Sequence, residues 1–137
     1  MYGKIMVPVD LAHIERLDKA ITTATDLAKH YGIPICFVGV TAETPTEVAH
    51  TPNEFAEKLA AFGATQSKMH DLDIETAAYP SHDPAADLDD TLIAAAKDNG
   101  ADLIVMASHV PGLPDHIFAS NAGAVASDAK VSVFVVR

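Results

Sequence analysis

The sequence predicts an α/β fold, namely an open sheet of five parallel strands with helices on both faces, of the Rossmann-like type. Five short apolar runs alternate along the chain with segments in which apolar residues recur at helical spacing. Strands separated by helices form parallel sheets through right-handed crossovers, and such sheets are covered on both faces. The 137 residues suit one domain spanning residues 1–137.

The first strand and the first helix account for the beginning of the chain. The run Lys4–Val9 is short and apolar, which is typical of a buried strand. Apolar residues then recur with a helical period from about Ile14 to His30, which predicts one helix over that stretch. Gly32 and Pro34 follow and end it, because both residues are common just beyond helix ends.

The next elements are a strand, a loop, a helix and a weaker strand. Ile35–Val40 is apolar throughout, as expected of a strand covered on both faces. Residues Thr41–His50 contain a proline and no periodicity, so we expect a loop. A helix from Asn53 to about His70 and a third strand at Leu72–Ala78 follow.

The last part of the chain repeats the alternation. Asp83, followed by proline, is a favourable helix start, and Gly100 is a favourable residue just beyond the helix end. Leu103–Ala107 is the fourth strand. After a loop rich in Pro and Gly, we expect a short alanine-rich helix from about Ser120 and a last strand at Val131–Val136.

Composition restricts the classes of partner. The formal net charge is −10, which argues against DNA, RNA or an anionic membrane, since affinity for these comes largely from Lys and Arg. No apolar segment approaches the roughly 18 residues of a membrane span. The single cysteine, Cys36, lies in an apolar run and is interpreted as a core residue. With no signal-like start, these features favour a cytoplasmic protein.

Parallel sheets bind ligands beyond the carboxyl ends of their strands, at the point where the strand order reverses. Asp10 comes directly after the first strand, where its carboxylate could accept hydrogen bonds from a ribose hydroxyl or an adenine amino group. The alternative is that Asp10 only caps the helix that follows. The residues alone leave both roles open.

A second candidate lies after the fourth strand. The segment from Ala107 to Gly112 leaves that strand, and the segment Ala119–Ala122 is expected to open the last helix. Small residues at a helix start let an anion approach the free amides, and the helix dipole favours negative charge there. Ordinary capping by Ser120 and close packing of alanines would explain the same pattern.

Dedicated catalytic and metal-binding motifs are missing from the sequence. It contains no Gly-x-Ser-x-Gly elbow and no Gly-Lys-Ser/Thr phosphate loop. Four scattered histidines have no strong metal-ligand spacing, namely His13, His82, His109 and His116. We therefore expect a binding protein rather than an enzyme, with slow ATP hydrolysis as a lower-ranked alternative.

Three segments together resemble the universal stress protein family: VPVD in the first strand, LIVMASH at the fourth, and Ser120-Asn121-Ala122 followed by the ending VSVFVVR. A bacterial subgroup is especially similar, with Ala-Ser-His-Arg-Pro after the fourth strand and Gly-Ser-Asn-Ala at the helix start. This chain departs from that pattern at Val110, where the subgroup has Arg, and at Ala119, where it has Gly. Both departures lie at the positions expected to face phosphates.

The resemblance implies a site for ATP or AMP, with Mg²⁺ accompanying ATP, in a protein of stress response or regulation. The adenine and ribose would be lined by Pro8, Val9, Asp10 and Val40. Residues Met106, Ala107, Ser108 and His109 would flank the ribose and phosphates, and the phosphate tail would be held by Ala119, Ser120, Asn121 and Ala122. The alternative function is a dimeric interaction protein of the same fold that does not bind nucleotide.

The last strand also predicts a homodimer. Val131–Val136 is nearly continuously apolar, and as the final strand it is expected at a sheet edge, where unpaired amide and carbonyl groups invite pairing. Self-pairing about a two-fold axis would cover that edge, and the family resemblance implies the same interface. A buried central strand with no role in assembly is the alternative.

Overall fold

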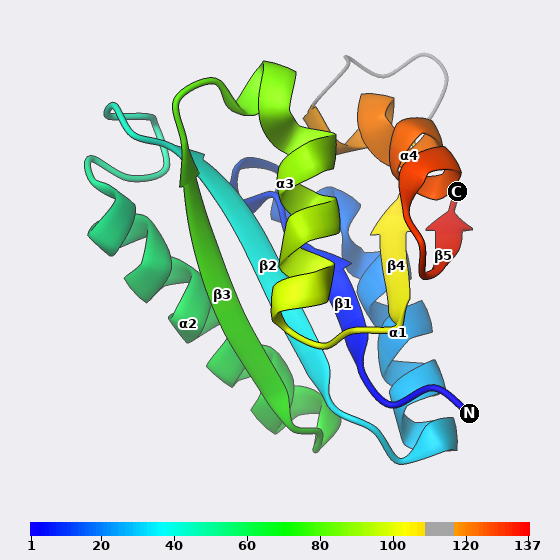
Figure 1. Ribbon diagram of the computed structural model, residues 1–137. Helices are drawn as coiled ribbons and strands as arrows, with labels where there is room; N and C mark the ends of the chain where they lie inside the picture. The colour runs from blue at the N-terminus through cyan, green and yellow to red at the C-terminus, as the bar shows by residue number, and fades with distance from the viewer. Residues whose placement is uncertain (109–116) are drawn as a thin grey trace.

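The computed structural model describes residues 1–108 and 117–137, and within 117–121 only the helical backbone. Helices and strands alternate as the sequence predicts (Figure 1). The strands are β1 Ile5–Pro8, β2 Ile35–Ala42, β3 Ile74–Ser81, β4 Leu103–Ala107 and β5 Ser132–Val136. The helices are η1, a 3-10 helix at Leu11–Arg16, α1 Asp18–Tyr31, α2 Pro52–His70, α3 Pro84–Asp98 and α4 Ile117–Asp128.

The five strands form one parallel sheet in the order β3-β2-β1-β4-β5. From β1 the chain adds β2 and β3 on one side and then β4 and β5 on the other, so the strand order reverses between β1 and β4. The expected α/β fold is thus confirmed. Strands β3 and β5 are the two edges, which confirms the predicted edge position of the last strand.

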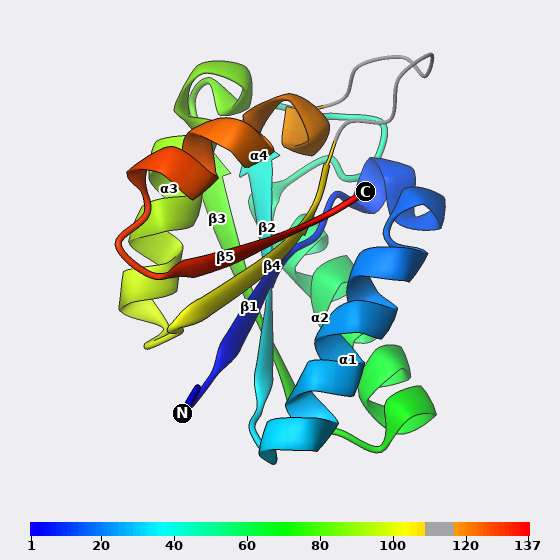
Figure 2. The ribbon, with the colours of Figure 1, turned by 90° about the vertical axis from the view of Figure 1, so that its right-hand side faces the viewer.

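Two apolar cores lie on opposite faces of the sheet (Figure 2). Alternate residues of one strand enter different cores: Ile5 and Val7 point toward α1 and α2, whereas Met6 points toward α3 and α4. A strand buried on both faces has to be apolar at successive positions, which explains the continuous apolar runs in the sequence. In the part of the chain that the structure describes, no helix has the length and apolar character needed to cross a membrane.

The beginning of the first helix differs from the prediction. Instead of one helix from Ile14, the chain forms η1 and then α1 from Asp18, with non-helical backbone at His13 (φ −136°, ψ 46°). The apolar period runs through the break, since Leu17 and Ile21 are both buried, but Ile14 is 39% exposed. Periodicity therefore located the buried face correctly and missed the change of helix type.

Other boundaries also shift, and β2 continues to Ala42, two residues into the predicted loop. Strand β3 begins at Ile74 and continues through Pro80, beyond the predicted end at Ala78; an edge strand tolerates proline because one row of its amides needs no partner. Helix α4 begins at Ile117, so Ser120 lies within its first turn and does not open the helix. The predicted start at Ser120 was wrong because the preceding Pro- and Gly-rich loop was extended too far along the chain.

The predicted helix ends at glycine and the capped start are confirmed. Gly32 and Gly100 follow α1 and α3 with φ of +66° and +69°, a backbone conformation that glycine adopts without steric cost. The Asp83 carboxylate accepts a hydrogen bond from the Ala86 amide (3.3 Å) and caps α3. These local signals fix both ends of α3 independently of its packing.

Candidate functional site

The ladder between the two central strands ends before their carboxyl ends. Strands β1 and β4 pair only at Ile5 with Leu103 and at Met6 with Ile104, although β1 extends to Pro8 and β4 to Ala107. Pro8, the last residue of β1, has no amide hydrogen and so cannot donate to a ladder. We call the boundary between β1 and β4 the central seam; it is closed at its amino end and open at its carboxyl end.

Beyond the last β1–β4 pair, each strand stays bonded to its outer neighbour. The Val9 amide donates to the Val38 carbonyl of β2 (2.8 Å), and the Ser108 amide donates to the Val136 carbonyl of β5 (2.8 Å). Beyond the last β1–β4 pair, these bonds hold each half of the sheet to its own outer strand. Such a separation at the reversal of strand order is where open α/β sheets bind their ligands.

Asp10 leaves β1 directly at the open end of the seam. Its backbone is extended (φ −96°, ψ 100°), and its side chain caps η1. One carboxylate oxygen accepts from the Ala12 amide (3.0 Å), and the other lies 2.9 Å from His13 Nδ1. The capping role considered from sequence is therefore real, and it fixes the direction in which the carboxylate points.

Several predicted apolar site residues come together on one face. Met106 of β4 and Ala122 of α4 belong to the core between the sheet and helices α3 and α4, and Val40 of β2 packs against it. Met106 is fully buried. Pro8 is buried at the end of β1. This face is the one from which α4 approaches the carboxyl ends of the strands (Figure 1).

Other predicted site residues lie elsewhere or outside the described part. Val9 is fully buried in the opposite core, toward α1 and α2, and Ala107 packs against that same core. Ser108 is half-buried just beyond β4. His109 lies outside the described residues, as do the side chains of the remaining three predicted site residues, Ala119, Ser120 and Asn121.

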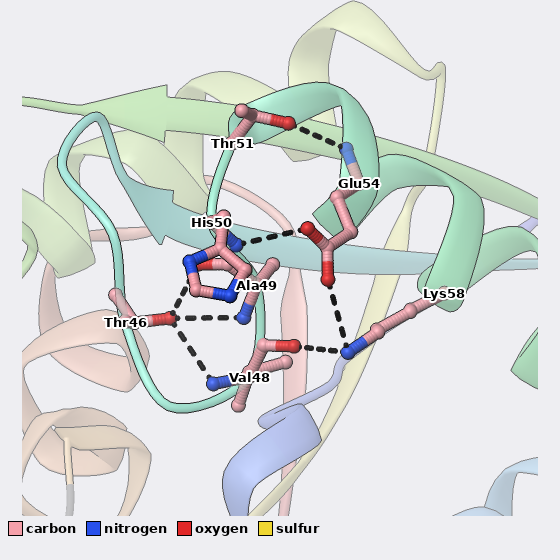
Figure 3. Close-up of polar contacts among 7 residues, drawn as sticks. All are labelled: Thr46, Val48, Ala49, His50, Thr51, Glu54 and Lys58. Carbon is pink, nitrogen blue, oxygen red and sulfur yellow. Dashed lines mark hydrogen bonds and ion pairs between the residues drawn. The ribbon is translucent and has the colours of Figure 1, made fainter.

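The loop that follows β2 is fixed to the first turns of α2 (Figure 3). Glu54 accepts from the His50 amide (3.1 Å) and pairs with Lys58 (3.4 Å), and Lys58 also donates to the Val48 carbonyl. The Thr46 hydroxyl accepts from the Val48 amide (3.3 Å). The His50 amide and then Lys58 hold the pKa of Glu54 below its usual value. The loop is therefore anchored locally to α2.

His13 is the residue of this region that sequence reasoning did not connect with the site. It was considered only as a metal ligand, yet its ring contacts the carboxylate of Asp10. The available signal was the spacing: an Asp followed three residues later by His, across a helix start, places the two side chains side by side.

Comparison with known proteins identifies the family of this chain. The model of the universal stress protein family matches residues 1–137. The chain belongs to the universal stress protein family. Universal stress protein G of Salmonella typhimurium is 30% identical over 142 residues, which cover all of both chains.

Solved structures of the family share the fold of this member. A universal stress protein from Archaeoglobus fulgidus superposes with a TM-score of 0.73 at 18% identity, and the match covers 100% of each chain. A second Archaeoglobus fulgidus structure, in complex with dAMP, gives a TM-score of 0.70 at 18% identity over 99% of this chain and 98% of that one. The order of strands and helices is thus that of universal stress proteins.

Proposed function

We propose that this universal stress protein binds an adenine nucleotide, ATP or AMP, at the open carboxyl end of the central seam. The observation that carries the proposal is the end of the β1–β4 ladder at Met6, ahead of Asp10, at the reversal of strand order. A relative of the same fold has been solved with dAMP. The proposed activity is binding that changes the protein's surface for a partner in stress response or regulation, and not turnover of the nucleotide.

In this proposal the adenosine moiety contacts the ends of β1 and β2. Asp10 accepts hydrogen bonds from a ribose hydroxyl or the adenine amino group, and Pro8 and Val40 line the same end, while the Val9 side chain lies in the opposite core. The bonds with Ala12 and His13 fix the direction of this carboxylate at the end of β1.

The ribose and phosphates are proposed to lie against the end of β4 and the first turn of α4. Met106, Ala107, Ser108 and His109 flank them. Because α4 begins at Ile117, its first free amides precede Ser120. We therefore propose that amides near Ala119 contribute to phosphate binding together with Ser120, Asn121 and Ala122. Mg²⁺ would accompany ATP.

Calorimetric titration of the purified protein with AMP, with GMP as the matched control, tests the proposal. We expect saturable binding of AMP and much weaker binding of GMP, which lacks the adenine amino group. Because the chain has no Trp and only three Tyr, co-purified adenine nucleotide would dominate its ultraviolet spectrum and must be removed first. No binding of AMP or ATP by the stripped, folded protein would favour the interaction protein without nucleotide.

We further propose that the protein is a homodimer through β5. This strand is a sheet edge, and Phe134 at its centre is 46% exposed. A second copy of β5, antiparallel about a two-fold axis, would satisfy the edge groups and cover Phe134. Sedimentation should give a dimer that Phe134→Lys converts to a monomer, while Met69→Lys, at another exposed apolar residue, leaves it unchanged. A soluble wild-type monomer would refute this interface.

A further inference from the structure

The ring of His13 is attached to Asp10 through both main chain and side chain. The His13 amide donates to the Asp10 carbonyl (3.0 Å), and Nδ1 lies 2.9 Å from the second carboxylate oxygen. The contact is sheltered, since 16% of the Asp10 side chain and 34% of the His13 side chain are exposed. His13 is also the position within η1 at which the backbone leaves helical geometry.

The chemistry of the pair determines which group donates the hydrogen bond. An ionised carboxylate only accepts hydrogen bonds, so the ring must carry its hydrogen on Nδ1 and donate it. With the Ala12 amide on one oxygen and His13 on the other, the carboxylate is held against rotation about its bond to Cβ. A carboxylate with a fixed direction loses less conformational entropy when a ligand donates to it.

We propose that His13 is a positioning residue, which orients the Asp10 carboxylate toward the adenosine moiety of the bound nucleotide. This inference rests on the proposed function. In this role His13 makes no contact with the ligand and acts on binding through Asp10. That distinguishes it from a residue that merely stabilises η1, whose loss would affect binding whether or not Asp10 is present.

A double-mutant cycle tests the inference by calorimetry with AMP. His13→Ala should weaken AMP binding about fivefold, the effect of one net hydrogen bond. His13→Asn should recover most of that loss, because its side-chain amide can donate from a position close to that of Nδ1. In the Asp10→Ala background, His13→Ala should have no further effect.

His70→Ala is the matched control, because His70 makes a comparable side-chain contact with Gln66 (3.2 Å) near the end of α2. It should leave AMP affinity unchanged. Circular dichroism checks that each variant folds. If His13→Ala does not fold, nitrogen NMR of the wild-type imidazole decides instead: hydrogen on Nδ1 supports the inference, and a ring protonated only on Nε2 overturns it.

The outcomes separate this inference from the proposed function. Wild-type protein that binds AMP, with His13→Ala binding equally well, overturns the positioning role alone. An effect of His13→Ala that persists in the Asp10→Ala background also overturns it, because His13 then acts by another route. Wild-type protein that binds neither AMP nor ATP overturns the proposed function and the positioning role together.

Discussion

Each end of the central seam carries an aspartate, and the two aspartates have different hydrogen-bond partners. At the closed end, Asp102 precedes β4 and accepts from the amides of Gly3 (2.9 and 3.1 Å) and Lys4 (3.2 Å). Its own amide donates to the Lys4 carbonyl (3.1 Å). At the open end, Asp10 follows β1, and its two named bonds stay within the turn that begins at its own position.

The difference shows how one residue type serves structure at one end of a sheet and a site at the other. Asp102 bridges the two strands across the seam and takes the place of ladder pairs before they begin. The named bonds of Asp10 instead orient its carboxylate within the turn that follows β1, beyond the last β1–β4 ladder pair. A carboxylate oriented at this end of the sheet is suited to meet a ligand there.

The largest expected effect is at the open end. Asp10→Ala should weaken AMP binding about 10- to 100-fold, because lost hydrogen bonds to a charged acceptor are worth about 1–3 kcal/mol. Loss of the cap on η1 should lower the free energy of unfolding by about 1 kcal/mol. Calorimetry and urea unfolding measure the two quantities, and unchanged affinity in the folded variant would contradict the role of Asp10.

The reverse result is expected at the closed end. Asp102→Ala should lower the free energy of unfolding by about 1–2 kcal/mol, since it leaves the amides of Gly3 and Lys4 without their carboxylate partner. AMP affinity should stay within a factor of about two of the wild-type value, because distant sites with no shared partners affect each other little. A large loss of affinity here, measured on folded protein, would show that the two ends are not independent.

A smaller effect is expected at the phosphate end. Val110→Arg combined with Ala119→Gly introduces the residues of the subgroup with the Ala-Ser-His-Arg-Pro segment, a phosphate partner and a residue without Cβ. We expect ATP affinity to rise several-fold, because the new arginine can add about one charge-assisted hydrogen bond to the phosphate tail. AMP affinity should rise less. Parallel titrations compare the two nucleotides, and equal gains would mean that these positions do not sense the phosphate tail.

The smallest effect concerns pH at the closed end. The hydrogen bond to Glu75 (2.8 Å) raises the pKa of Lys4 above its usual 10.5. Stability from this pair is complete below the unfolded pKa and is lost as pH rises through the higher folded value. The expected loss is under about 1 kcal/mol, as for other exposed pairs. Urea unfolding of wild type against Lys4→Met, between about pH 9 and pH 12, isolates it from tyrosine titration.

Local signals in the sequence predicted the elements better than they predicted the site. Asp83 and Gly100 mark the ends of α3 correctly, because capping and left-handed backbone depend on neighbouring residues alone. The division of the first helix at Leu17 was missed, since Asp10 and His13 shape η1 through side-chain contacts that a hydrophobic period does not register.

The site depends on relations between segments distant in the chain. Asp10 could be placed after β1 from its position alone, but the separation of β1 from β4 follows from which strands become neighbours. The different faces of Val9 and Met106 follow from the register of the sheet. Sequence reasoning therefore gave a set of candidate residues, and the structure divided that set between two cores.

The most direct test of the account is to locate bound AMP on the protein by amide chemical shifts. Titration of isotope-labelled protein should perturb the amides at the open end of the seam, at Asp10, Val40 and Ser108. The chemical shifts of the Gly3 and Asp102 amides at the closed end should stay unchanged. Perturbations that cluster at the closed end, or saturable AMP binding that leaves Asp10 and Ser108 unmoved, would contradict a nucleotide site at the open end.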